Sequence, residues 1–148
     1  MAIVDTIRDY WGWVGLKPAQ VVAENDFGNL LVRDQSGRFW RLCPEDLYCK
    51  VVAHTRADLD ALIRDPEFES DWCMDRLVEE ASARLGPLEA GRKYCLKVPG
   101  ILGGEYGGDN LGTISLAELI AASGTIAKQI DGLPDGARVR LSVGDAPD

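Results

Sequence analysis

Residues 29–42 read NLLVRDQSGRFWRL, which places a short apolar run on each side of the polar segment DQSG at 34–37. Asp, Ser and Gly favour tight turns, and leucine, valine and aromatic side chains on both sides of such a segment are typical of paired strands. The stretch therefore predicts a β-hairpin.

The same pattern extends in both directions from this hairpin. Apolar runs at residues 19–24 and 47–53 flank it, and the turn-forming segment NDFG at 25–28 joins the first run to the hairpin. Connections this short cannot join parallel strands, which need crossovers of about a dozen residues or more. The sequence thus predicts a four-stranded antiparallel meander between residues 19 and 53.

Helical periodicity lies on both sides of the meander. A short helix is expected at 3–11, and helices at 56–64 and 67–85 are separated by Pro66, which interrupts a helix that reaches it. Thr55 can cap the first helix of the later pair. The residues of that pair expected to face the interior are Leu59, Leu62, Ile63, Phe68, Trp72, Leu77, Val78, Ala81 and Leu85.

The last third of the chain predicts two more strands, a helix and a final strand. The strands at 93–98 and 111–114 are separated by a glycine-rich loop at 99–110. The helix at 116–130 begins with SLAE, a capping box in which the serine accepts a free N–H and the glutamate reaches back. A turn then leads to the final strand at 137–143.

The order of these segments decides the fold class. Strands, then helices, then a strand, a helix and a strand lack the alternating βα repeat of a doubly wound sheet. We therefore expect an α+β fold: a mostly antiparallel sheet with helices packed on one side. A chain of 148 residues can form a core without a metal or a disulfide. The expectation is a single compact domain spanning residues 1–148.

The net charge and the cysteines of the chain limit the partners that it can bind and the compartment in which it is expected. The formal net charge is −8, which opposes binding to nucleic acid. The N-terminal segment has no long apolar stretch, and no run approaches the roughly 20 apolar residues of a membrane span. Four cysteines occur without a C-x-x-C pair and with only one histidine, so a zinc site would need an unusual ligand set. We expect a cytoplasmic protein with free thiols, no metal, no cofactor and no contact with membranes.

Catalytic motifs are missing from the sequence. It contains neither the phosphate-binding G-x-x-x-x-G-K-[ST] nor the nucleophile motif G-x-S-x-G. A histidine-based triad would depend on His54 alone, whose position between a strand and a helix cap is typical of local hydrogen bonding. The glycine-rich loop departs from G-x-G-x-x-G and precedes a strand, which favours a structural or protein-contact loop over a nucleotide site. The chain is not expected to be an enzyme.

Most of the net charge is concentrated in the predicted helices. Residues 58–80 hold nine acids and two arginines. A solvated helix face, a docking surface for a basic partner and a cation site are all compatible with this pattern, although the spacing matches no EF-hand loop.

Several segments resemble one protein family. The resemblance is to the C-terminal-domain family of type VI secretion immunity proteins, the cognates of DNase toxins, in which the domain often follows a GAD-like domain. It implies an N-terminal extension at 1–25 and a family-like core at 26–143, and the tail at 144–148 is expected to be frayed because it is terminal. The matching segments are DFGNL at 26–30, the strand–turn–strand at 33–42, RLGPL at 84–88 with Gly91, GG at 103–104 with DNL at 109–111, SLAEL at 115–119 and LPDG at 133–136.

The resemblance implies an immunity protein that binds a toxin stoichiometrically and covers its active site or functional surface. A nuclease toxin has a basic cleft for phosphates, and an acidic surface can occupy such a cleft. The alternatives are an adaptor or chaperone that escorts a secreted effector without inhibiting it, and an enzyme that reverses a toxin's modification. The expected toxin-binding residues are Asp65, Glu67, Glu69, Asp71 and Asp75 in the helices and Glu105, Tyr106 and Asp109 in the loop.

Overall fold

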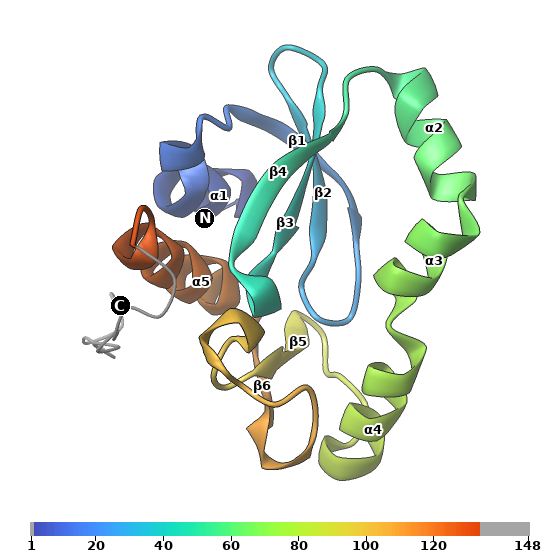
Figure 1. Cartoon of the computed structure of the whole chain (residues 1–148), viewed down its shortest axis with the longest axis vertical. Coiled ribbons are helices and arrows are strands. Elements are labelled where there is room, and N and C mark those ends of the chain that lie inside the picture. Colours follow the sequence, from blue (N-terminus) through green and yellow to red (C-terminus); the bar gives the residue numbers. More distant parts are fainter. Residues whose placement is uncertain (1, 134–148) are drawn as a thin grey trace.

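The hairpin forms the centre of a four-stranded sheet in the computed structural model, which describes residues 2–133. The strands pair antiparallel in the order β1-β2-β3-β4, as predicted. Figure 1 shows the sheet between two groups of helices. The strand bounds are Pro18–Glu24 for β1, Leu30–Asp34 for β2, Phe39–Cys43 for β3 and Tyr48–Ala53 for β4.

The turn between β2 and β3 is built on the carboxylate of Asp34. Its Oδ1 accepts the backbone N–H groups of Ser36 and Arg38 at 2.8 and 2.9 Å, and its Oδ2 accepts the indole N–H of Trp40 at 2.9 Å. Burial acts to raise the pKa of Asp34, but the hydrogen bonds from Trp40, Arg38 and Ser36 outweigh burial, and the pKa is lowered. The turn thus depends on an ionised, almost fully buried side chain.

Helices cover both faces of this sheet, and the placement of the helices on one side is therefore wrong, although the α+β class and the antiparallel sheet are confirmed. One face packs on α1 (Ile3–Trp11) and α5 (Leu116–Ile130). The other packs on α2 (Arg56–Arg64) and α3 (Pro66–Cys73). The physical reason is that β2 and β3 bury consecutive side chains, so that apolar surface projects from both sides.

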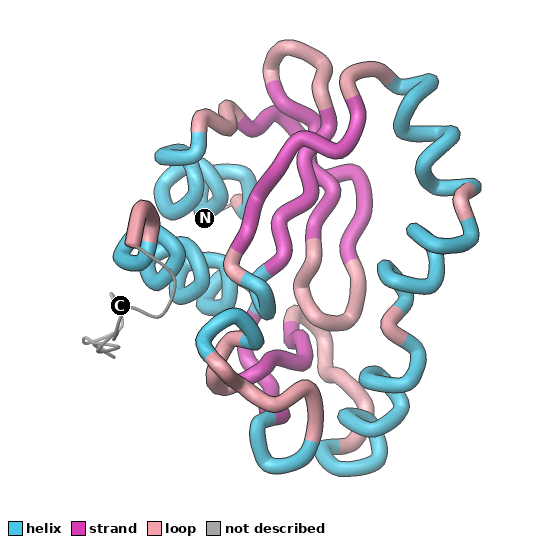
Figure 2. The backbone as a smooth tube through the Cα atoms, in the orientation of Figure 1, coloured by secondary structure: helices cyan, strands magenta, loops and turns pink. Residues whose placement is uncertain are grey.

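A second, smaller sheet closes one end of the molecule. Strands β5 (Arg92–Leu96) and β6 (Leu111–Ser115) pair antiparallel and pack with Phe27 against α4 (Asp75–Leu85). The backbone tube in Figure 2 shows these two strands below the main sheet. The long loop between β5 and β6 contains two short 3₁₀ turns.

The helical region after the main sheet differs from the prediction in two respects. The helix expected at 67–85 is divided into α3 and α4 at Met74, whose φ of 51° is unusual for a residue with a side chain. Ile63 and Leu85, expected to be buried, are 46% and 41% exposed. The caps at Thr55 and Ser115 are confirmed, because each side chain accepts the predicted backbone N–H.

Helices α1 and α5 approach each other closely at Gly124. A Cβ on Gly124 would lie 2.4 Å from the carbonyl oxygen of Tyr10, so only glycine fits there. The strand expected at 137–143 and the tail at 144–148 lie outside the described residues.

Candidate protein-binding surface

The acidic residues predicted to bind a partner are all exposed, on α3 and at the ends of its neighbouring segments. Asp65 caps α3 by accepting the N–H of Glu67 at 3.0 Å. Asp71 pairs with Arg41 of β3 across 2.5 Å. Glu67, Glu69 and Asp75 form no ion pair with any residue between 2 and 133. Their charge is therefore available to a partner.

Arg41 holds α3 against the sheet. Its side chain is 7% exposed, and its guanidinium carbon lies 5.7 Å from the ring centre of Phe68 and 5.3 Å from that of Trp72. The Arg41 Nε also donates to Asn29 Oδ1 at 3.1 Å. Arg41 therefore helps to position the helix and its acids, together with the packing of Phe68 and Trp72 on the sheet and the hydrogen bond from Asn25 to the Trp72 carbonyl.

The glycine-rich loop between β5 and β6 is braced by Asn110. The Asn110 amide donates to the carbonyls of Val98 and Glu105 at 2.9 and 2.7 Å and accepts the N–H of Val98 at 2.8 Å. Gly104 passes so close to Val98 that a Cβ there would lie 1.8 Å from the Val98 carbonyl oxygen. The loop is a cross-braced structural element, and its glycines permit close packing of the backbone.

The three loop residues predicted to contact a partner are exposed, and two of them also dock the loop on the rest of the protein. The Tyr106 hydroxyl donates to the carboxylate of Asp46. Asp109 lies 3.4 Å from an Arg84 nitrogen on α4. The N–H of Gly108 is hydrogen-bonded at 2.6 Å to the carboxylate of Glu80, also on α4.

Helix α4 connects the two predicted groups of residues. Asp75 is its first residue, while Glu80 and Arg84 in its second half contact the glycine-rich loop. The helix rises about 1.5 Å per residue, so the two groups are separated by more than one turn. Figure 1 shows α3 beside the main sheet and the glycine-rich loop at the end of the molecule where β5 and β6 lie, so the two groups are not a single cluster.

A buried polar network that the sequence analysis missed links Arg41 to the loop. The Asn29 amide, which receives the Arg41 hydrogen bond, donates to Glu45 at 2.5 and 2.9 Å. The Cys43 thiol donates to Glu45 at 3.2 Å and lies 3.8 Å from Asp46, the partner of Tyr106. Cys43, Glu45 and Asp46 are close in sequence, but Asn29 is 16 residues from Glu45 and Tyr106 is 60 residues from Asp46, so local spacing could not have indicated the whole network.

The same network contains a group of possible metal ligands, formed by Cys43, Glu45 and Asp46, whose ligand atoms lie within 4.8 Å of one another. Burial raises the pKa of Cys43, and the hydrogen bond that its thiol donates to Glu45 acts in the same direction. Burial also raises the pKa of Glu45, although hydrogen bonds from Asn29 and Cys43 act against it. Metal binding and nucleophilic chemistry both need the thiolate, which this environment disfavours. The group is better suited to holding a proton than a cation.

Replacing Glu45 with glutamine is expected to flatten the pH dependence of stability. Because burial raises the pKa of Glu45 above its ordinary 4.5, the folded protein keeps a proton that the unfolded chain releases. The stabilisation from Glu45 is therefore lost as the pH rises above 4.5 and through the pKa of the folded protein. The lowered pKa of Asp34 affects stability only as the pH falls below 3.8, outside this range.

The measurement is urea unfolding at about pH 5 and about pH 8. Wild type should lose stability between these values, and E45Q should lose less. The control E118Q makes the same chemical change at an exposed position on α5 and should behave like wild type. An equal loss in E45Q and wild type would show that Glu45 does not hold the proton.

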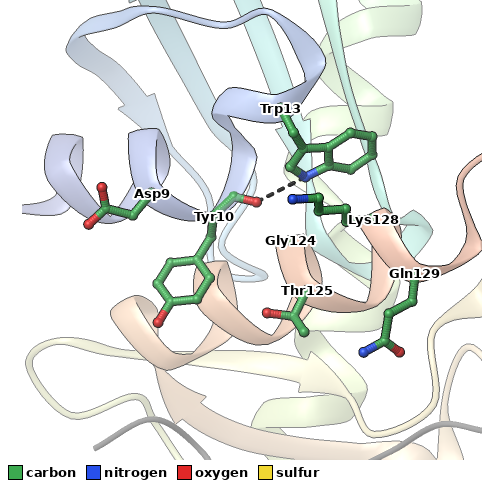
Figure 3. A pocket seen from close by; sticks show the side chains of 7 residues that line it. All are labelled: Asp9, Tyr10, Trp13, Gly124, Thr125, Lys128 and Gln129. Atoms are coloured by element: carbon green, nitrogen blue, oxygen red, sulfur yellow. Dashed lines mark hydrogen bonds between the residues drawn. The ribbon is translucent and has the colours of Figure 1, made fainter.

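A separate hollow of about 600 Å³ lies between α1 and α5, on the other face of the main sheet from α3. Figure 3 shows its lining, which includes Asp9, Tyr10, Trp13 and Lys128. The Trp13 indole N–H donates to the Tyr10 carbonyl at 3.0 Å and serves local structure. The hollow contains none of the predicted binding residues.

Comparison with known proteins places the chain in a family. In the part of the chain that the structure describes, no helix has the length and apolar character needed to cross a membrane. Searches of curated proteins and of solved structures each found no match. Residues 53–127, just over half of the chain, match the family model described as "T6SS immunity protein Tdi1, C-terminal". The match runs from the end of β4 into α5 and includes α3, α4 and the glycine-rich loop. The chain therefore belongs to this family of type VI secretion immunity proteins.

Proposed function

We propose that this immunity protein binds its cognate toxin stoichiometrically in the cytoplasm of the producing cell and occludes the toxin's active site or another surface the toxin needs. The observation that supports it best is the set of unpaired acids on and beside α3, a helix that lies in the segment matching the family and that contacts Arg41 of β3. Inhibition by occlusion requires affinity and no turnover, so the protein needs no catalytic centre.

The expected partner is a toxin domain with a basic cleft. Negative charge is presented by α3 and its junctions with α2 and α4, through Asp65, Glu67, Glu69, Asp71 and Asp75. The loop adds Glu105 and Asp109. Charge of one sign on one side of a protein accelerates association with the opposite charge and makes it sensitive to salt. A cleft that binds phosphates has the matching charge, and the acidic surface would fill it in place of nucleic acid.

The test is co-expression with the effector encoded beside this chain's gene. Cells that produce the effector should grow only when the immunity protein is present, and the two proteins should purify together. A complex that forms while the effector stays fully active would favour an adaptor or chaperone instead. Failure to protect and to bind would overturn the proposal.

A further inference from the structure

The glycine-rich loop exposes a small apolar patch, which we define as Val98, Ile101 and Tyr106. Their exposed fractions are 39%, 64% and 50%. The loop brings these residues close together, because its backbone folds back at Gly104 onto the Val98 carbonyl and the Tyr106 ring lies over Gly100, the residue before Ile101. Single exposed apolar residues are common on protein surfaces, whereas a group of them marks an interaction site more often.

Hydrogen bonds hold the loop that carries the patch. The Asn110 clasp fixes Val98 and the Glu105 carbonyl. The hydroxyl of Tyr106 is fixed on Asp46, which belongs to the short 3₁₀ turn Pro44–Asp46. A loop backbone and a tyrosine ordered before binding lose less conformational entropy when a partner covers them, which suits this loop to tight contact.

Acidic groups surround the patch. Asp46, Glu105 and Asp109 lie on the turn and the loop that form it, and Lys97 is the single base between β5 and β6. An apolar centre that includes a tyrosine, with a charged rim, is the usual composition of a specific protein interface. The sign of the rim matches a basic partner surface and disfavours a second copy of this acidic chain.

We infer that Ile101 and Tyr106 anchor the toxin by filling an apolar recess that lies beside its basic cleft, while the acids of α3 and α4 act earlier, by steering the encounter. This inference rests on the proposed function and adds to it separate roles for the acids and for the apolar patch. The unpaired acids Glu67, Glu69 and Asp75 set the association rate, and the patch sets the dissociation rate.

The experiment measures binding kinetics of the full chain with a catalytically inactive variant of the neighbouring effector. Ile101→Ser should raise the dissociation rate constant by about tenfold or more and leave the association rate constant within about twofold of wild type. The change should persist from about 50 mM to about 500 mM salt, because an apolar contact is not screened. Tyr106→Ala should also raise the dissociation rate constant. Thermal unfolding of this variant checks that the protein is still folded.

The matched control is Ile63→Ser, the same change at an isoleucine that is 46% exposed on α2. It should bind like wild type. If wild type binds but Ile101→Ser dissociates no faster than Ile63→Ser, the anchoring role is wrong and the proposed function stands. If wild type does not bind the effector at all, both the anchoring role and the proposed function are overturned.

Discussion

Replacing Arg41 with alanine is expected to lower the free energy of unfolding by about 3 kcal/mol, as for other changes that leave a buried cavity and an unsatisfied polar group. The variant removes the side chain packed against the stacked rings of Phe68 and Trp72 and the donor to Asn29 Oδ1. It also weakens the attachment of α3, which keeps the packing of Phe68 and Trp72 on the sheet and the hydrogen bond from Asn25 to the Trp72 carbonyl. Urea unfolding measures the stability, and amide exchange in α3 measures its attachment.

Two further variants separate the causes of this loss. Arg41→Met keeps most of the packed volume and should lose less stability than Arg41→Ala. Asp71→Asn should cost less than about 1 kcal/mol, because the Asp71 side chain is 68% exposed and an ion pair with an exposed partner contributes little. A loss below about 1 kcal/mol in Arg41→Ala would show that other contacts hold α3 in place.

Neutralising three unpaired acids is expected to slow toxin capture by about tenfold or more at low salt. The variant is E67Q/E69Q/D75N, which removes charge that no described base compensates. Because the effect acts through long-range attraction, the association rate constants of variant and wild type should converge as salt approaches about 0.5 M. The dissociation rate constant should change by less than about twofold. Stopped-flow or surface-based kinetics over a salt series measure both rate constants.

The control for this variant has the same charge in a different place. D9N/E118Q/D131N also removes three negative charges, and each triple change raises the formal net charge from −8 to −5. These three residues are exposed on α1 or on α5 and the turn after it, away from α3. Equal slowing by both variants would mean that net charge matters and its position does not.

Local sequence signals predicted the elements that local chemistry determines. The DQSG turn, the Thr55 cap and the Ser115 capping position each rest on a side chain that bonds to backbone within four residues, so the pattern contains the interaction itself. The meander followed from connections too short for any other pairing. The α+β class was therefore readable without a structure.

The features that sequence reasoning missed depend on distant contacts. Leu30, Leu31 and Val32 are consecutive and all buried, a pattern typical of a strand covered on both faces, which contradicts the expectation of helices on one side only. Methionine rarely adopts the left-handed backbone conformation found at Met74, so the sequence did not predict the break between α3 and α4. The predicted binding residues are all exposed. The contact of Arg41 with α3 and the exposure of Ile101, however, depend on the tertiary structure and could not be predicted from the sequence.

The central claim is that this protein acts by covering a toxin, and titration of the toxin's activity tests it most directly. Purified effector, held well above the dissociation constant, is mixed with increasing amounts of the immunity protein. Activity should fall linearly and reach zero at one equivalent, and both proteins should be recovered unmodified. Full activity in a saturated complex, or complete loss at a small fraction of one equivalent, would contradict stoichiometric occlusion.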